Sequence, residues 1–150
     1  MPFDSLTMAA AEAELNAKLL GGRIMKIHQP DRFSIILRVH SGGSNYRLLL
    51  CAHPVLGRLH LTENAGENPA APPLFCMVLR KHLEGAKIVA ITQQNWDRVI
   101  HLDFNATDET GEPVKRRLIL EIMGKHSNLI LTDAETNMIF DGMRRYSFHL

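Results

Sequence analysis

The sequence predicts an α+β protein, mostly an antiparallel β-sandwich with two helices. Two segments have helical composition, and each is followed by glycine, which commonly ends a helix. Between and after them, short stretches alternate apolar and polar residues and are separated by Gly-, Asn- or Pro-containing turns, as in strands with one buried face. The order helix, strands, helix, strands favours antiparallel sheet packed in two layers. The 150 residues are 45% hydrophobic and 22% charged, which suits one globular domain.

The first helix is expected over residues 5–20. Asp4 or Ser5 can cap its first turn, and Gly21-Gly22 follows its end. The apolar residues expected on its buried side are Met8, Ala11, Leu15 and Leu19.

Strands are expected over four following segments. In the second and third of them, alternate positions are apolar, so each has one face to bury. The segments are 23–29, 33–40 (buried face Phe33, Ile35, Leu37 and Val39), 45–52 (Tyr46, Leu48 and Leu50) and 57–62, with a turn at 41–44.

A loop over 64–73 leads to the second helix. Pro72-Pro73 stands where a helix can begin, because proline lacks only an amide hydrogen that would be unpaired there. The helix is expected over 74–83, and its buried side comprises Phe75, Val78, Leu79 and Leu83. The remaining elements are strands at 87–93, 98–104, 116–123, 127–132 and 138–142, with turns at 94–97, 124–126 and 133–137.

Composition and motifs argue against an enzyme with a bound cofactor or metal. The chain has no Walker loop, dinucleotide fingerprint, His-Glu-x-x-His or Gly-x-Ser-x-Gly motif, and its eight histidines lack metal-ligand spacing. Cys51 and Cys76 are expected to be free thiols in a reducing cytoplasm. No apolar run approaches the roughly 18 residues that span a bilayer, so no membrane partner is expected.

Three places carry side chains suited to RNA. Asp97-Arg98 lies at a predicted hairpin tip beside Trp96, where an arginine can fork onto a phosphate, although charged pairs are also common in turns. Gly124 permits a sharp turn that would present Lys125, His126 and Asn128 as donors, although a plain turn needs no function. The third place is Arg80-Lys81-His82, which a favourable interaction with the C-terminus of its helix also explains.

Several segments together resemble the NFACT N-terminal domain, which begins the bacterial RqcH proteins (long called fibronectin-binding protein A) and the eukaryotic Rqc2 and NEMF proteins. The resemblance covers essentially the whole chain. It is carried by Phe3-Asp4, Leu20 to Ile24 through Gln29-Pro30, Asn68-Pro69 through Pro72-Pro73, Phe75 to Met77, Leu79 to Gly85, Asp97-Arg98 and Met123 to Leu131.

The resemblance implies a fold similar to the N-terminal domain of formamidopyrimidine-DNA glycosylases, and a cytoplasmic, non-enzymatic role. It implies binding to tRNA (alanyl-tRNA in bacteria) and to the large ribosomal subunit with peptidyl-tRNA, for template-free tailing of stalled chains. Residues tied to tRNA engagement fall on Asp97 and Arg98, with Asp4 and Glu121 as weaker matches. The chain stops at Tyr146–Leu150 without turn residues or a polar tail, so residues 1–150 are expected to be a truncated NFACT domain lacking the family's later domains.

Two rival functions follow from the same resemblance. A glycosylase would attack with the amine of Pro2 beside an acidic residue, but Phe3 stands where that acid should be. The older family name suggests an adhesin that binds fibronectin. Without a signal sequence at the N-terminus, fibronectin is expected only as a secondary partner in vitro.

Overall fold

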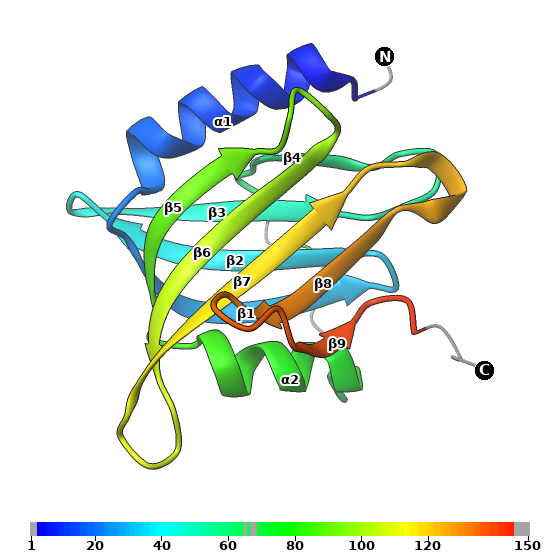
Figure 1. Ribbon diagram of the computed structural model, residues 1–150. Coiled ribbons are helices and arrows are strands. Elements are labelled where there is room, and N and C mark those ends of the chain that lie inside the picture. Colours follow the sequence, from blue (N-terminus) through cyan, green and yellow to red (C-terminus); the bar gives the residue numbers. More distant parts are fainter. Residues whose placement is uncertain (1–2, 65, 67–68, 146–150) are drawn as a thin grey trace.

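A computed structural model of the chain describes residues 3–64, 66 and 69–145; Pro2 and Tyr146–Leu150, which entered the sequence arguments, lie outside this part. The described chain alternates helices and antiparallel strands as predicted (Figure 1). The elements are α1 (Ser5–Leu19), β1 (Arg23–Asp31), β2 (Ser34–Ser41), β3 (Ser44–Cys51), β4 (Arg58–Leu61), α2 (Leu74–Leu83), β5 (Lys87–Gln93), β6 (Val99–Thr107), β7 (Pro113–Glu121), a 3₁₀ turn (Gly124–His126), β8 (Asn128–Asp133) and β9 (Ile139–Gly142).

Within the described residues, all nine strands belong to one sheet in the order β4-β3-β2-β1-β5-β6-β7-β8-β9, and every neighbouring pair is antiparallel. Figure 1 shows that β1–β4 cross behind β5–β8, so the sheet folds over into two layers, with α1 and α2 at opposite edges of the fold. The predicted fold class is therefore confirmed, and the two layers are continuous through hydrogen bonds.

The two layers join where β1 meets β5. Their strand register contains one Cα pair, Arg23 with Lys87. Main-chain hydrogen bonds extend this seam, with Gly21 N donating to Ile88 O and Ile88 N donating to Gly22 O, both at 2.8 Å. The glycine pair thus ends α1 and turns the chain directly into the seam.

The core lies between the layers and beneath both helices, and the predicted helix faces are mostly correct. Met8, Leu15 and Leu19 of α1 are fully buried, with Ala11 partly buried against the core. In α2 the predicted Phe75, Leu79 and Leu83 are buried, Val78 is partly buried, and Cys76 joins them.

Polar bonds also hold α1 on β5. Asn16 Nδ2 donates to Ile91 O at 2.9 Å, and the Gln93 main-chain N–H donates to the Glu12 carboxylate. Since these bonds come from successive turns of the helix, they fix its position along the strand as well as its distance from it.

The buried face predicted for the second strand is confirmed for Ile35, Leu37 and Val39, which lie in the main core. The prediction for Phe33 was wrong, because Phe33 lies in the turn before β2 and packs in a separate small cluster with Ile36, Leu49 and Cys51. The strands predicted for the β6–β7 hairpin are also shorter than those observed. β6 extends to Thr107 and β7 begins at Pro113, and these outer ends are too short and too poor in large apolar side chains to show a strand pattern.

Both cysteines are free thiols, as predicted, and both are buried. Burial raises the pKa of the Cys76 thiol, which disfavours the reactive thiolate. In the part of the chain that the structure describes, no helix combines the length and apolar character needed to cross a membrane.

Candidate nucleic-acid interface

The connection between β5 and β6 is a tight turn that projects an exposed tryptophan. Asp97 N donates to Gln94 O, and Gln94 N donates to Val99 O, both at 2.8 Å. Asn95 and Trp96 between them have φ angles of 49° and 58°, the pattern of a type I′ turn. The Trp96 side chain is 79% exposed. The hairpin therefore holds a large aromatic ring in solvent.

Asp97 and Arg98 follow the tryptophan and are both exposed. Asp97 Oδ1 accepts the Arg98 main-chain N–H at 2.7 Å, which fixes the direction of the carboxylate. Among residues 3–64, 66 and 69–145, no side chain or carbonyl pairs with the Arg98 guanidinium. The tip thus offers an uncommitted planar donor next to an oriented acceptor.

The first turn of α1 lies against this tip. Gln93 Nε2 donates to Asp97 O at 2.7 Å and to Ser5 O at 3.0 Å, which joins the two segments. Asp4 precedes Ser5 and caps the helix, since its Oδ1 accepts the Thr7 N–H at 2.8 Å. The same bond lowers the pKa of the Asp4 carboxyl. Asp4 is therefore close to the tip, but one of its carboxylate oxygens is occupied by the cap.

Glu121 lies at the same end of the sheet. The strand register pairs Glu121 with Val99 on one side and with Asn128 on the other. Ile122 N donates to Arg98 O at 2.9 Å, so the end of β7 is bonded directly to the hairpin. Glu121 is half-buried, and burial raises the pKa of its carboxyl.

The turn after β7 presents fewer donors than expected. Lys125 and His126 are exposed in the 3₁₀ turn. Asn128 is buried: its Nδ2 donates to Arg144 O at 3.2 Å, and its Oδ1 accepts the Arg144 N–H at 2.9 Å. The expectation that Asn128 is presented on this loop is therefore wrong, because its amide holds the chain after β9.

A hollow of about 350 Å³ opens beside this turn. Its lining combines two carboxylates, an imidazole, two guanidiniums and two aliphatic side chains. These belong to Glu121, Asp141, His126, Arg144, Arg145, Ile130 and Ile139. Arg145 is held by Asp141 through two bonds of 2.8 and 2.7 Å, so its charge is already paired. The hollow is thus mixed in character, with acceptors and donors around apolar surface.

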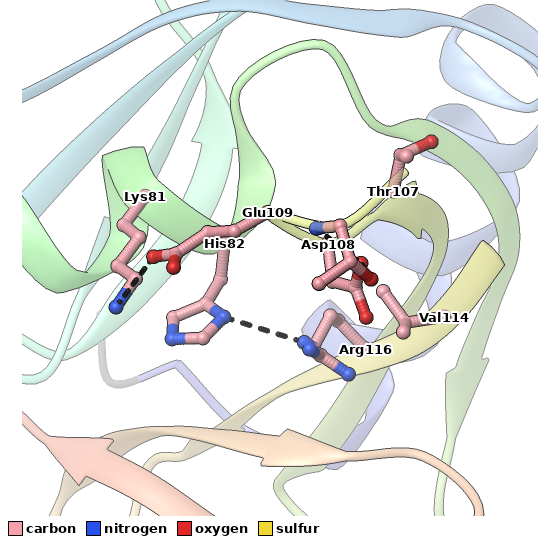
Figure 2. Close-up of a pocket in the computed structure, with 8 residues that line it drawn as sticks. Lys81, His82, Thr107, Asp108, Glu109, Val114 and Arg116 are labelled. Atoms are coloured by element: carbon pink, nitrogen blue, oxygen red, sulfur yellow. Dashed lines mark hydrogen bonds and ion pairs between the residues drawn. The ribbon is translucent and has the colours of Figure 1, made fainter. Parts of the chain in front are cut away.

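The three basic residues of α2 form a separate group. Arg80 Nε donates to Ile27 O at 2.9 Å, so this side chain joins α2 to β1. Lys81 is exposed, and its Nζ lies 3.0 Å from a Glu109 carboxylate oxygen. His82 lines a hollow of about 260 Å³ with Lys81 and Glu109 (Figure 2).

His82 packs against a buried arginine. Arg116 Nε lies 3.4 Å from His82 Nδ1 (Figure 2). The His82 ring also stacks on Phe140, with ring centres 4.5 Å apart. Burial, followed by the charges of Arg116 and Lys81, lowers the pKa of His82. Arg116 precedes Glu121 by five residues on β7, roughly 16 Å at the usual strand rise. The α2 group therefore does not join the hairpin tip.

The basic run at 115–117 is divided between two environments. Arg116 is buried, whereas Arg117 forms two bonds to Asp103, at 2.7 and 3.0 Å. Lys115 lies 3.9 Å from Glu135. The positive charges of this run are consequently paired with carboxylates of the protein itself. No cluster of three or more His, Cys, Asp or Glu with metal-binding geometry occurs among the described residues.

A family model described as NFACT N-terminal and middle domains matches residues 4–150. The chain belongs to this family. It is 47% identical over 147 residues to the Rqc2 homolog RqcH of Bacillus subtilis, an alignment that covers 98% of this chain and 26% of that protein. It is 32% identical over 133 residues to the human ribosome quality control complex subunit NEMF, covering 89% of this chain and 12% of NEMF.

Solved structures of similar proteins share the fold. The N-terminal domain of the fibronectin-binding protein PavA from Streptococcus pneumoniae has a TM-score of 0.95 and 41% identity, covering 98% of this chain and 56% of that one. A fibronectin/fibrinogen-binding protein from Streptococcus suis also has a TM-score of 0.95, with 42% identity. The chain spans about a quarter of the length of the bacterial RqcH relatives.

In this NFACT domain the ten residues predicted as a site fall into two groups. One end of the sheet gathers Asp4, Asp97, Arg98, Glu121, Lys125, His126 and the buried Asn128, whereas Arg80, Lys81 and His82 lie apart on α2. Sequence reasoning missed the conformation of Trp96 and the place of Arg144, because neither has a short-range signal in the sequence. The hairpin end is therefore the candidate interface.

Proposed function

We propose that this NFACT domain binds tRNA within a cytoplasmic ribosome quality-control factor. The whole protein would recruit tRNA, alanyl-tRNA in bacteria, to the obstructed large ribosomal subunit with peptidyl-tRNA. It would thereby support template-free C-terminal tailing, with the peptide bond made by the ribosome and no catalytic residue in this domain. Relatives named for ribosome quality control support this role. The observation that carries the site assignment is the uncommitted Arg98 guanidinium beside Asp97 at a rigid hairpin tip.

The chemistry of the tip suits RNA. A guanidinium can donate two parallel bonds to a phosphate or to a base edge, and a neighbouring carboxylate can accept from a base amine. Lys125 and His126 lie at the same end and supply exposed donors for phosphate, while Glu121 and the adjacent hollow offer further acceptors. In this proposal Arg80 and His82 of α2 contribute less, because both side chains are engaged inside the protein.

The test is to sequence the RNA that co-purifies with the full-length protein. Asp97→Ala/Arg98→Ala is compared with the wild type and with Lys115→Ala/Glu135→Ala, which also removes one exposed base and one exposed acid. Enrichment of one tRNA class in the wild type and in the control, but not in the tip variant, supports the proposal. If the folded tip variant retains the tRNA, the site assignment is wrong; if no protein enriches tRNA, the function is wrong.

Fibronectin binding is the second candidate, because the similar PavA domain is named for it. Purified protein would be passed over immobilised fibronectin and over immobilised albumin at physiological salt. Saturable binding to fibronectin alone, unchanged by Asp97→Ala/Arg98→Ala, would establish a separate property. Equal signals on both surfaces would exclude it.

A further inference from the structure

Trp96 occupies a turn position that is unfavourable for it. Type I′ turns need positive φ at both central residues, and Asn-Gly is the preferred pair because glycine has no Cβ to strain. Asn95 follows that preference, but Trp96 stands in the place of glycine with a φ of 58°. Local turn stability therefore does not explain a tryptophan here, and strained residues of this kind gather at functional sites.

Packing does not explain this tryptophan either. Its side chain is 79% exposed, and within the described residues it has no aromatic or cation–π partner. The turn beneath it is firmly held, because Gln93 bonds Asp97 O and Ser5 O. The structure thus maintains an exposed indole on a fixed support, which limits the entropy lost when the ring binds something.

We propose that Trp96 stacks on an unpaired base of the bound RNA while Asp97 and Arg98 contact the edge or phosphate of that nucleotide. This inference rests on the proposed function and adds to it the kind of RNA element recognised. An aromatic face stacks on any base, so affinity would come from the ring and discrimination from the adjacent polar groups. Bases inside a duplex have both faces covered, so the partner element is a loop or a single-stranded end.

The alternative occupant of an exposed indole is a protein surface. A protein-docking aromatic usually stands within an apolar patch. Here the other residues from 93 to 98 are all polar: Gln, Gln, Asn, Asp and Arg. Leu6 on the first turn of α1 is exposed, but it is a single aliphatic side chain. The surroundings of Trp96 therefore favour a nucleotide, which offers an aromatic face together with polar edges.

The test uses the intrinsic fluorescence of Trp96, which is the one tryptophan in the sequence. The 150-residue chain is titrated with tRNA, with a short single-stranded RNA and with a fully paired RNA of the same length. Affinity is measured in parallel for Trp96→Phe, which keeps a ring, and Trp96→Gly, which suits the turn. Thermal unfolding of each variant shows whether the fold is intact.

We expect tRNA and single-stranded RNA to quench the fluorescence and duplex RNA to leave it unchanged. Trp96→Gly should bind tRNA roughly 5- to 150-fold more weakly, the usual cost of losing one stacked base, with a melting temperature no lower than the wild type. Trp96→Phe should stay within a few-fold of the wild type. Binding of tRNA without quenching, or with equal affinity in Trp96→Gly, overturns this inference but leaves the proposed function standing. Absence of tRNA binding by the wild-type chain overturns the proposal that this domain binds tRNA, and this inference with it.

Discussion

Arg116 and Asp133 form an ion pair in which loss of the aspartate charge should destabilise the protein much more than loss of the arginine. The Arg116 side chain is 8% exposed, and its Nη1 lies 3.2 Å from Asp133 Oδ2. Its guanidinium carbon also lies 4.6 Å from the centre of the Phe140 ring. The Asp133 side chain is 20% exposed, and its other oxygen accepts the main-chain N–H groups of Glu135 and Thr136. The arginine therefore depends on the pair more than the aspartate does.

Asp133→Asn isolates that dependence, because an amide oxygen can still accept the two turn bonds while the charge is lost. Removing one partner of a buried pair costs about 3–5 kcal/mol, and the partial exposure of Asp133 places this variant near about 3 kcal/mol. Arg116→Met keeps much of the apolar stem and leaves a carboxylate that is still solvated. It loses chiefly the contact with the Phe140 ring, about 1 kcal/mol. The double variant should resemble Arg116→Met.

Denaturant unfolding of the four proteins at pH 7 measures these differences directly. In thermal unfolding, at roughly 2–4 °C per kcal/mol for a chain of this size, Asp133→Asn should lower Tm by about 6–12 °C and Arg116→Met by about 2–4 °C. If Asp133→Asn costs no more than Arg116→Met, or if adding Arg116→Met fails to recover stability, the unpaired charge of Arg116 is not what destabilises the protein, and the reasoning is refuted.

Three further perturbations have defined outcomes. Because burial raises the pKa of Glu121, its ionised form opposes folding, so Glu121→Gln should raise Tm at pH 7, with the gain disappearing below the ordinary pKa of 4.5. A Cβ on Gly22 would lie 2.7 Å from Val39 Cγ1, so Gly22→Ala should cost about 1–3 kcal/mol, seen as a lower denaturant midpoint at an unchanged slope. Burial lowers the pKa of His82 and of His101, so below pH 6.5 the unfolded chain binds more protons than the folded protein, and the free energy of unfolding falls as the pH falls. The double variant His82→Gln/His101→Gln should therefore show a shallower decline of Tm between pH 6.5 and 5 than the wild type.

Much of the fold could be predicted because local patterns determine it. The alternation of Ile35, Leu37 and Val39 matches a strand with a buried face, and Gly85 follows α2 with a φ of 83°. The outer part of the β6–β7 hairpin was missed, since residues 105–107 and 113–115 contain no large apolar side chain except Val114 and pair through their main chains. The continuity of the two layers through Arg23 and Lys87 has no local signal at all.

The candidate site was less predictable, because it depends on register and on distant partners. That Glu121 neighbours the hairpin follows from its pairing with Val99, which no spacing in the sequence specifies. Asn128 was expected to be exposed, but it is buried, and its amide bonds the main chain of Arg144, 16 residues later. The roles of these residues in tRNA binding stay predictions, as does the similarity to the glycosylase domain.

The order of the strands also bears on how the chain folds during synthesis. All neighbouring strands but one pair are consecutive in sequence, so β1–β4 can form as local hairpins as soon as they emerge from the ribosome. The exception is β1 with β5, and α1 rests on that same β5 through Asn16 and Glu12. The first helix to be synthesised therefore acquires its docking strand only after residue 93. Until then its buried side, including Met8 and Leu15, is not covered by β5. Pairing of β1 with β5 is therefore the step of sheet formation that joins segments far apart in the sequence.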